Sequence, residues 1–252
     1  MRPESLWRST ASIPPRAARV PREVDVLVVG AGITGLTAAY LLARSGKRVA
    51  IAERERIGSG ETGNTSAHLT QITDLRITEL ARRFGREAAR LAWDGGAVAI
   101  DLIESIVERE GIACDFARVP GWLCPPFFEP DNDGRSLLAD VELAQELGIH
   151  ASYRRSGALD ERPAVAFADQ ALLHPLRYLA GLAAAAEAAG VTIVEHAEVS
   201  EVLQDPLVAV VNGENVACGD VVIATHVPIV GSTGLVRATM FQTKLYPHSS
   251  YV

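Results

Sequence analysis

The sequence has few cysteines, no excess of positive charge and no long apolar run. Its three cysteines are Cys114, Cys124 and Cys218. They are far apart, form no Cys-x-x-Cys pair and leave an odd one over, so neither a disulfide framework nor a zinc site is indicated. We therefore expect no metal and a reducing, cytoplasmic setting.

The charge balance argues against a nucleic-acid surface. Asp and Glu total 31 and Lys and Arg total 24, which gives a formal net charge of −7. Nucleic-acid binding needs clustered Lys and Arg, but here Arg is scattered among acids. No apolar run approaches the length of a membrane span, and residues 1–22 contain four prolines instead of the apolar core of a signal peptide. The composition predicts a globular protein of one or two domains that does not contact a membrane.

A glycine-rich turn is the strongest motif. Gly30-Ala31-Gly32-Ile33-Thr34-Gly35 follows the apolar run Val24–Val29 and opens an apolar, helix-like stretch. This pattern is typical of dinucleotide binding. The first glycine permits the tight turn, the second lets the backbone approach a pyrophosphate, and the third lets the helix pack on the strand. The N–H groups of Ile33 and Thr34 would face the phosphates at the positive end of the helix.

An acid follows at the spacing that this motif predicts. The second apolar run, 48–52, ends in Glu53, eighteen positions after Gly35. A carboxylate there accepts hydrogen bonds from a ribose hydroxyl. Strand, glycines, helix, second strand and acid occur in order, so the motif does not depend on the glycines alone.

A polar stretch comes next. Residues 57–73 are rich in Gly, Ser and Thr, and we expect a surface loop whose hydroxyl and N–H groups could wrap phosphates or a ring. For each single Ser or Thr, turn stabilisation competes with direct contact.

Periodicity and turn signals predict the remaining elements. Residues 1–22 should be an extended arm without a helix, because proline and charge dominate. Gly95-Gly96 marks a break or a close approach within a helical stretch, and Asn212-Gly213 predicts a hairpin turn. The expected elements are helices at 76–110, 136–148 and 176–189; β-like segments at 114–128, 191–194, 199–203, 207–211, 214–218 and 236–252; and a buried parallel strand at 221–226.

The order of these features resembles the FAD-dependent oxidoreductases of the D-amino acid oxidase and glycine oxidase type, over almost the whole chain. Four segments resemble, more narrowly, a bacterial branch that often carries a C-terminal Rieske iron–sulfur domain: Ser5-Leu6-Trp7, Ile57–Gly63, His174–Leu179 and Leu245–His248. The resemblance implies an α/β fold, with a Rossmann-like FAD-binding domain and an antiparallel β substrate domain. It also implies oxidation of an amine or amino acid by hydride transfer to flavin.

The resemblance carries cofactor contacts over to individual positions. Gly30, Gly32, Ile33, Thr34 and Gly35 would meet the pyrophosphate, and Glu53 would meet the ribose. Residues along the pyrophosphate and towards the flavin would be Arg54, Ser59, Thr62, Thr65 and Ser66. Val199 would contact adenine, and Ala224 and Thr225 would approach the cofactor at the end of the late strand.

The chain departs from the family pattern at its end. The family continues with more substrate-domain strands and a glycine-rich segment that closes over the flavin, so we expect a truncated chain with an incomplete substrate domain. No Cys-x-His pair occurs, so a Rieske cluster cannot be built from this chain. Possible partners are therefore an electron acceptor or the missing C-terminal half. The expected domains are an arm at 1–22, FAD-binding segments at 23–110 and 171–235, and substrate-domain segments at 111–170 and 236–252.

Three histidines are candidates for the chemistry, and the catalytic residues are otherwise unassigned. His68 follows the polar loop and could face the flavin, where related dimethylglycine dehydrogenases have a histidine bonded to FAD, or it could serve a turn. His174 precedes Pro175, so capping or packing competes with a role beside the flavin or substrate. His226, at the end of the late strand, is a cofactor-proximal candidate.

Two other functions remain open at this point. An NAD(P)-dependent dehydrogenase would share the glycine turn and the acid, but it gives no reason for the hairpin and the late strand. A non-catalytic FAD-binding fragment would fit a truncated chain.

Overall fold

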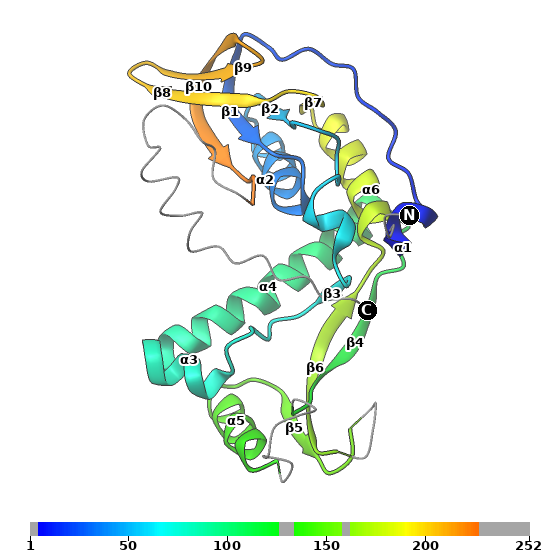
Figure 1. Cartoon of the computed structure of the whole chain (residues 1–252), viewed down its shortest axis with the longest axis vertical. Helices are drawn as coiled ribbons and strands as arrows, with labels where there is room; N and C mark the ends of the chain where they lie inside the picture. Colours follow the sequence, from blue (N-terminus) through cyan, green and yellow to red (C-terminus); the bar gives the residue numbers. More distant parts are fainter. Residues whose placement is uncertain (1–4, 126–133, 158–161, 227–252) are drawn as a thin grey trace. The chain divides into compact units, whose positions relative to one another are not determined.

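The computed structural model describes residues 5–125, 134–157 and 162–226 (Figure 1). They divide into two compact units. Unit 1 takes residues from 1–66, 110–114 and 174–252, and unit 2 takes those from 67–109 and 115–173. The expected assignment of segments to cofactor and substrate stays a prediction, and residues 236–252, with Leu245–His248, lie outside the described residues.

Unit 1 is built on a six-stranded sheet in the order β7-β2-β1-β10-β9-β8 (Figure 1). The neighbours from β7 to β10 pair in parallel, whereas β10, β9 and β8 pair antiparallel. All four residues of β2 and most of β1 are buried, which is typical of strands in a parallel sheet covered on both faces. The strands are β1 (Glu23–Val29), β2 (Val49–Ala52), β7 (Thr192–Val194), β8 (Val199–Gln204), β9 (Leu207–Val211) and β10 (Glu214–Ile223).

Two helices pack on each other in unit 1. They are α2 (Ile33–Arg44) and α6 (Pro175–Ala188), and α2 also contacts β1 and β2. The buried positions of α2 include Leu36, Ala39, Tyr40 and Ala43, which recur at intervals of three and four and so form one helix face. The strand–turn–helix–strand unit expected over residues 24–53 is therefore confirmed.

The hairpin between β9 and β10 is confirmed. Asn212 has φ 49° and Gly213 has φ 82°, the pair of positive angles that a type I′ turn requires. Through this hairpin the antiparallel strands share a core with the parallel ones. That core consists of Val24, Leu27, Val29, Ala50, Ala52, Val194, Ala197, Val199, Ala209, Val211 and Val216.

β10 corrects two expectations. The runs 214–218 and 221–226 form one strand that ends at Ile223, because the backbone continues through Gly219. A Cβ at Gly219 would lie 2.7 Å from the carbonyl oxygen of Asp25, so only glycine lets β10 pass this close to β1. The strand is parallel to β1 as expected, but it is less buried than expected, since Ile223 is 57% exposed.

Unit 2 contains a sheet whose paired strands are all antiparallel. β6 pairs with β3, β4 and β5. Trp93 and Phe167 meet edge to face in its core with ring centroids 5.4 Å apart, and Trp93 Nε1 donates to Thr73 Oγ1 over 3.1 Å. The elements are β3 (His68–Leu69), α3 (Ile77–Phe84), α4 (Arg86–Glu110), β4 (Ala117–Leu123), α5 (Arg135–Glu146), β5 (Ala151–Arg154) and β6 (Ala164–Leu172). The last residue of α4, Glu110, is assigned to unit 1.

The long helical stretch breaks at a different glycine from the expected pair. Gly85, with φ 87°, separates α3 from α4, and Gly95-Gly96 lies inside the continuous α4. The alternative of a close approach is right for Gly96, since a Cβ there would lie 2.7 Å from Cα of Gln71. Gly95 has open space around it. Sequence periodicity alone could not distinguish a glycine that ends a helix from one that another segment touches.

The N-terminal arm contains a helix that its composition did not predict. α1 (Leu6–Thr10) begins after Ser5, whose Oγ accepts a hydrogen bond from the Arg8 N–H over 3.4 Å. Residues 11–22 contain no further helix, and Ala17 forms an antiparallel bridge with Val194. A five-residue helix is too short to be stable by itself, so its contacts with distant residues must hold it.

The adjacent glycines of α4 give a matched test of this packing. We expect Gly96→Ala to destabilise the protein by about 1–3 kcal/mol, because its Cβ must displace the backbone at Gln71. We expect Gly95→Ala to stabilise it by about 0.5–1 kcal/mol, because an open helix position favours alanine. Urea unfolding of both variants measures the difference, and equal effects would contradict the packing at Gln71.

Candidate cofactor site

The glycine turn connects the end of β1 to α2 and requires glycine at two positions. Gly30 has φ 103°, and a Cβ on it would lie 2.7 Å from the carbonyl oxygen of Ala224. A Cβ on Gly35 would lie 2.0 Å from the carbonyl oxygen of Gly30. The Gly30 N–H donates to Ala52 O and the Ala224 N–H to Val29 O, each over 2.9 Å. The turn is therefore fixed where β1, β2 and β10 all end.

The N-terminus of α2 suits an anion. Gly32 is its N-cap and provides no side-chain cap, and the first turn contains no acidic residue. The first N–H groups of a helix have no partner within the helix and carry the positive end of its dipole. Among them, the Ile33 N–H donates to Thr62 Oγ1 over 3.4 Å, and Thr34 is exposed. These groups fit the pyrophosphate of a dinucleotide.

Glu53 lies against the same turn. Its Oε2 accepts from the Ala31 N–H over 2.7 Å, and its Oε1 accepts from the Glu55 N–H over 2.8 Å. The backbone of Glu53 continues the sheet, because its N–H donates to Val194 O over 2.9 Å and its carbonyl accepts from the Ala197 N–H over 2.8 Å. Each carboxylate oxygen has a second lone pair, so the side chain can still accept from a ribose hydroxyl.

The polar loop is folded rather than extended. Gly60 precedes a short 3-10 helix, η1 (Glu61–Asn64), and Gly63 is buried, with its Cβ position 2.4 Å from Gly58 O. Thr62 is the loop side chain that contacts the start of α2. Of the other expected loop residues, Ser59 accepts through Oγ from the Arg56 N–H over 3.4 Å, and Arg54, Thr65 and Ser66 are exposed.

His174 caps α6, as its position before Pro175 indicates, and a role beside the flavin or substrate stays a prediction. Its Nδ1 accepts from the Arg177 N–H over 3.3 Å, so the neutral ring carries its proton on Nε2, which lies 3.0 Å from Thr10 Oγ1. The residue is only 6% exposed.

Tyr178, one turn later, is buried beside Thr37, and burial raises the pKa of Tyr178 to about 12. Its phenol is therefore protonated at neutral pH and cannot act as a base.

The other expected residues lie in different settings. Val199 is 7% exposed and packs in the core of unit 1, and the exposed His226, with φ 61°, follows Ala224 and Thr225 beyond β10. His68 is an exposed residue of β3 in unit 2, where it pairs with Leu172 of β6. Contacts of these residues with a cofactor stay predictions.

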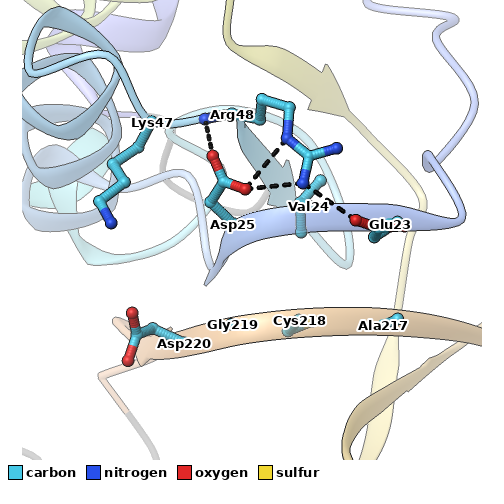
Figure 2. Close-up of a pocket in the computed structure, with 9 residues that line it drawn as sticks. All are labelled: Glu23, Val24, Asp25, Lys47, Arg48, Ala217, Cys218, Gly219 and Asp220. Atoms are coloured by element: carbon cyan, nitrogen blue, oxygen red, sulfur yellow. Dashed lines mark hydrogen bonds and ion pairs between the residues drawn. The ribbon is translucent and has the colours of Figure 1, made fainter.

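A separate hollow of about 390 Å³ lies at the opposite end of β1 (Figure 2). Arg48 fills one side of it, because its guanidinium bonds Asp25 Oδ1 over 2.7 Å and Glu23 Oε1 over 3.0 Å. Hydrogen bonds from Arg48 lower the pKa of Asp25. Nucleotides bind at the carboxyl ends of parallel strands, so this hollow is not the cofactor site.

Sequence reasoning missed Glu195. It follows β7 as Glu53 follows β2, and its side chain is only 1% exposed. Oε1 accepts from the Ile57 N–H and Oε2 from the Arg16 N–H, each over 2.9 Å. An acid directly after a buried apolar run was the available signal.

Comparison with known families decides the cofactor. The family model described as "FAD dependent oxidoreductase", DAO, matches residues 25–252. The chain belongs to this family. Its members use FAD, which confirms the expected cofactor and the D-amino acid oxidase type, and corrects the NAD(P)-dependent alternative.

Several relatives are similar over much of the chain. "Putative Rieske 2Fe-2S iron-sulfur protein YhfW" of Bacillus subtilis is 28% identical over 97% of this chain and 48% of its own length. "Probable oxidoreductase OrdL" of Haemophilus influenzae is 28% identical over 80% of this chain and 48% of its own. "Gamma-glutamylputrescine oxidoreductase" of Escherichia coli is 33% identical over 48% of this chain and 27% of its own. The chain thus spans about half the length of the first two relatives.

Solved structures share the fold. Glycine oxidase from Geobacillus kaustophilus superposes with a TM-score of 0.66 at 24% identity, over 81% of this chain and 55% of that one. L-amino acid deaminase from Proteus vulgaris superposes with a TM-score of 0.65 at 17% identity, over 85% and 50%. The expected α/β class, with a mostly parallel sheet and a separate antiparallel one, is confirmed.

Within residues 5–125, 134–157 and 162–226, no group of three or more His, Cys, Asp or Glu side chains could hold a metal ion. No helix in those ranges is both long and apolar enough to cross a membrane.

Gly32→Ala tests the pyrophosphate position. A Cβ on Gly32 would meet only Thr62 Oγ1, at 3.4 Å, so the free protein should tolerate it. A pyrophosphate that approaches this backbone would meet the new methyl group. We expect FAD affinity to fall at least about tenfold, or 1.4 kcal/mol, with an unchanged unfolding midpoint of the apoprotein. Equal affinity, measured by flavin fluorescence, would place the pyrophosphate elsewhere.

Glu53→Ala tests the ribose contact. We expect FAD binding to weaken by about 1–3 kcal/mol, as for hydrogen bonds to a charged group. Glu55→Ala is the matched control, because Glu55 is an exposed acid two residues away. Titration of each apoprotein with FAD gives the affinities, and circular dichroism checks the fold. If both variants bind FAD equally well, Glu53 only stabilises the turn.

Proposed function

We propose that the chain carries the FAD site of an oxidoreductase that oxidises an amine or amino acid, a CH–NH donor, by hydride transfer to flavin. The observation that carries the proposal is the assembly at the carboxyl ends of β1, β2 and β10. There, the uncapped start of α2, the Glu53 carboxylate and the Thr62 hydroxyl meet. This arrangement offers an anion site and a ribose acceptor side by side, as a dinucleotide requires.

The donor class rests on the relatives. Gamma-glutamylputrescine oxidoreductase is named for an amine substrate, and glycine oxidase, L-amino acid deaminase and L-proline dehydrogenase are named for amino acids. Hydride transfer from such donors needs a held flavin and an oriented substrate more than a strong acid or base. The described part of the site supplies binding groups without such a pair, which suits this chemistry.

Each group at the site has a distinct proposed role. The N–H groups at the start of α2, with Ile33 and Thr34, hold the pyrophosphate. Glu53 accepts from the ribose, while its bond to the Ala31 N–H keeps the turn in shape. Thr62 fixes the polar loop to the helix start. Bound FAD supplies the hydride acceptor, and roles for His68 or His226 beside it stay predictions.

The electron acceptor is proposed to lie outside this chain. A relative that matches 97% of this chain is named as a Rieske iron–sulfur protein. The 252 residues of this chain, however, contain no Cys-x-His pair. Such a cluster would therefore come from another segment or another protein. The cytoplasmic location likewise remains a proposal.

A non-catalytic FAD-binding role is the second candidate. The observation that favours it is that the described site consists of binding groups: the N–H groups at the start of α2, the Glu53 carboxylate and the Thr62 hydroxyl.

Flavin release and reduction test both candidates. We expect denaturation to release FAD, and anaerobic mixing to show slow or no bleaching by amines and amino acids with this chain alone. In a fusion of this chain to the remaining half of a relative, the flavin absorbance should bleach rapidly, because the added half shields the flavin from water. The fusion with Glu53→Ala, measured without added FAD, is the control for cofactor loss.

The outcomes separate the proposals. Bleaching by 2-hydroxy acids but not by amines would overturn the donor class. Retained FAD with no bleaching in either protein would favour the non-catalytic role, and release of a nicotinamide nucleotide without flavin would contradict the cofactor.

A further inference from the structure

The N-terminal strap, residues 5–17, binds to the cofactor loop, residues 56–66, within unit 1. Three side chains of the strap donate hydrogen bonds to loop carbonyl oxygens. Ser5 Oγ donates to Gly63 O over 2.6 Å, Trp7 Nε1 donates to Thr65 O over 2.7 Å, and the Arg8 guanidinium donates to Ser59 O. Because the acceptors are main-chain atoms, these bonds fix the path of the loop.

A second set of contacts anchors α1 of the strap to α6. The Trp7 ring meets the His174 ring edge to face, with centroids 5.0 Å apart, and Thr10 Oγ1 lies 3.0 Å from His174 Nε2. The other ring nitrogen of His174 is held by the Arg177 N–H. Because His174 is buried and both of its ring nitrogens have partners, its ring is held in one orientation. This fixed ring explains how the five-residue helix α1 is stabilised.

The far end of the strap is joined to the start of the loop through Glu195. This carboxylate accepts from the Arg16 N–H of the strap and the Ile57 N–H of the loop, each over 2.9 Å. Arg56 of the loop donates to Ile13 O over 2.8 Å and lies 3.9 Å from Glu195 Oε2. A buried carboxylate needs such partners, so strap and loop are held together at both ends.

The loop is flexible in composition but must be ordered to hold a cofactor. Residues 56–66 contain three glycines, Gly58, Gly60 and Gly63. Ordering such a segment only when a ligand arrives reduces affinity, because the lost backbone entropy opposes binding. A loop that is already held in the bound shape avoids that cost. Thr62 contacts the start of α2. In the sequence it lies between Ser59 and Thr65, whose carbonyl oxygens accept from Arg8 and Trp7.

We propose that the N-terminal strap is a positioning element for FAD: Trp7 and Arg8 hold the cofactor loop in its binding shape before the cofactor arrives. The proposal rests on the proposed placement of FAD beside this loop. His174 then anchors the strap through Trp7 and Thr10 and takes no part in the oxidation reaction.

Two substitutions separate positioning from general stability. Trp7→Phe keeps an aromatic, though smaller, ring against His174 and removes the Nε1–H donor. Arg8→Ala removes the bond to Ser59. Each should weaken FAD binding about fivefold, as for one hydrogen bond, and the double variant roughly ten- to thirtyfold. Arg19→Ala is the control, since Arg19 is an exposed arginine just beyond the strap. Arg8→Lys should restore part of the loss.

The readouts are FAD affinity by flavin fluorescence, the unfolding midpoint of the apoprotein, and amide hydrogen exchange of residues 56–66. We expect weaker binding and faster loop exchange in the double variant with an unchanged midpoint, because release of a peripheral strap is a local opening. Unchanged FAD affinity in the double variant would overturn the strap's role alone. A fall in midpoint that accounts for the whole loss would also overturn it. Failure of the wild type to bind FAD would overturn the proposed function and the strap's role with it.

Discussion

The close approach of α2 to the end of β1 is the constraint on which the candidate cofactor site depends. With only 2.0 Å between the Cβ position of Gly35 and the carbonyl oxygen of Gly30, no side chain fits. This contact sets the start of α2 directly at the ends of β1 and β2, where its N–H groups and the Glu53 carboxylate share one small region. The residue after β10 restricts Gly30 in the same way, because a Cβ on Gly30 would lie 2.7 Å from the carbonyl oxygen of Ala224.

Two acids with similar sequence settings serve different ends in this arrangement. Glu53 and Glu195 each follow a short apolar strand of the parallel sheet. Glu53 stays partly accessible at the turn, where it can accept from a ribose, whereas Glu195 is buried and satisfied by two N–H groups from separate segments. Desolvation makes an unpaired carboxylate costly, so the burial of Glu195 ties the arm and the loop to the sheet.

His174 shows that a histidine at a helix start can have a structural role. Its two ring nitrogens contact the Arg177 N–H of α6 and the Thr10 hydroxyl of α1. FAD supplies the reactive group in this family, so the protein's contribution is mainly to bind and orient. The described site consists of backbone N–H groups, one carboxylate and one hydroxyl, which are groups that bind and orient a cofactor.

The sequence by itself determined the local elements with strong periodicity or turn chemistry. The glycine turn, α2, the Asn212-Gly213 hairpin and the Pro175 start of α6 depend on residues close in the chain, and the structure has each of them. Tertiary structure decided what depended on distant partners. It set the break at Gly85 instead of Gly95-Gly96, formed α1 in a proline-rich arm and buried Glu195. Periodicity reports one segment's own preference, whereas a buried charge, a short helix or a touched glycine is stable only against a segment that the fold brings to it.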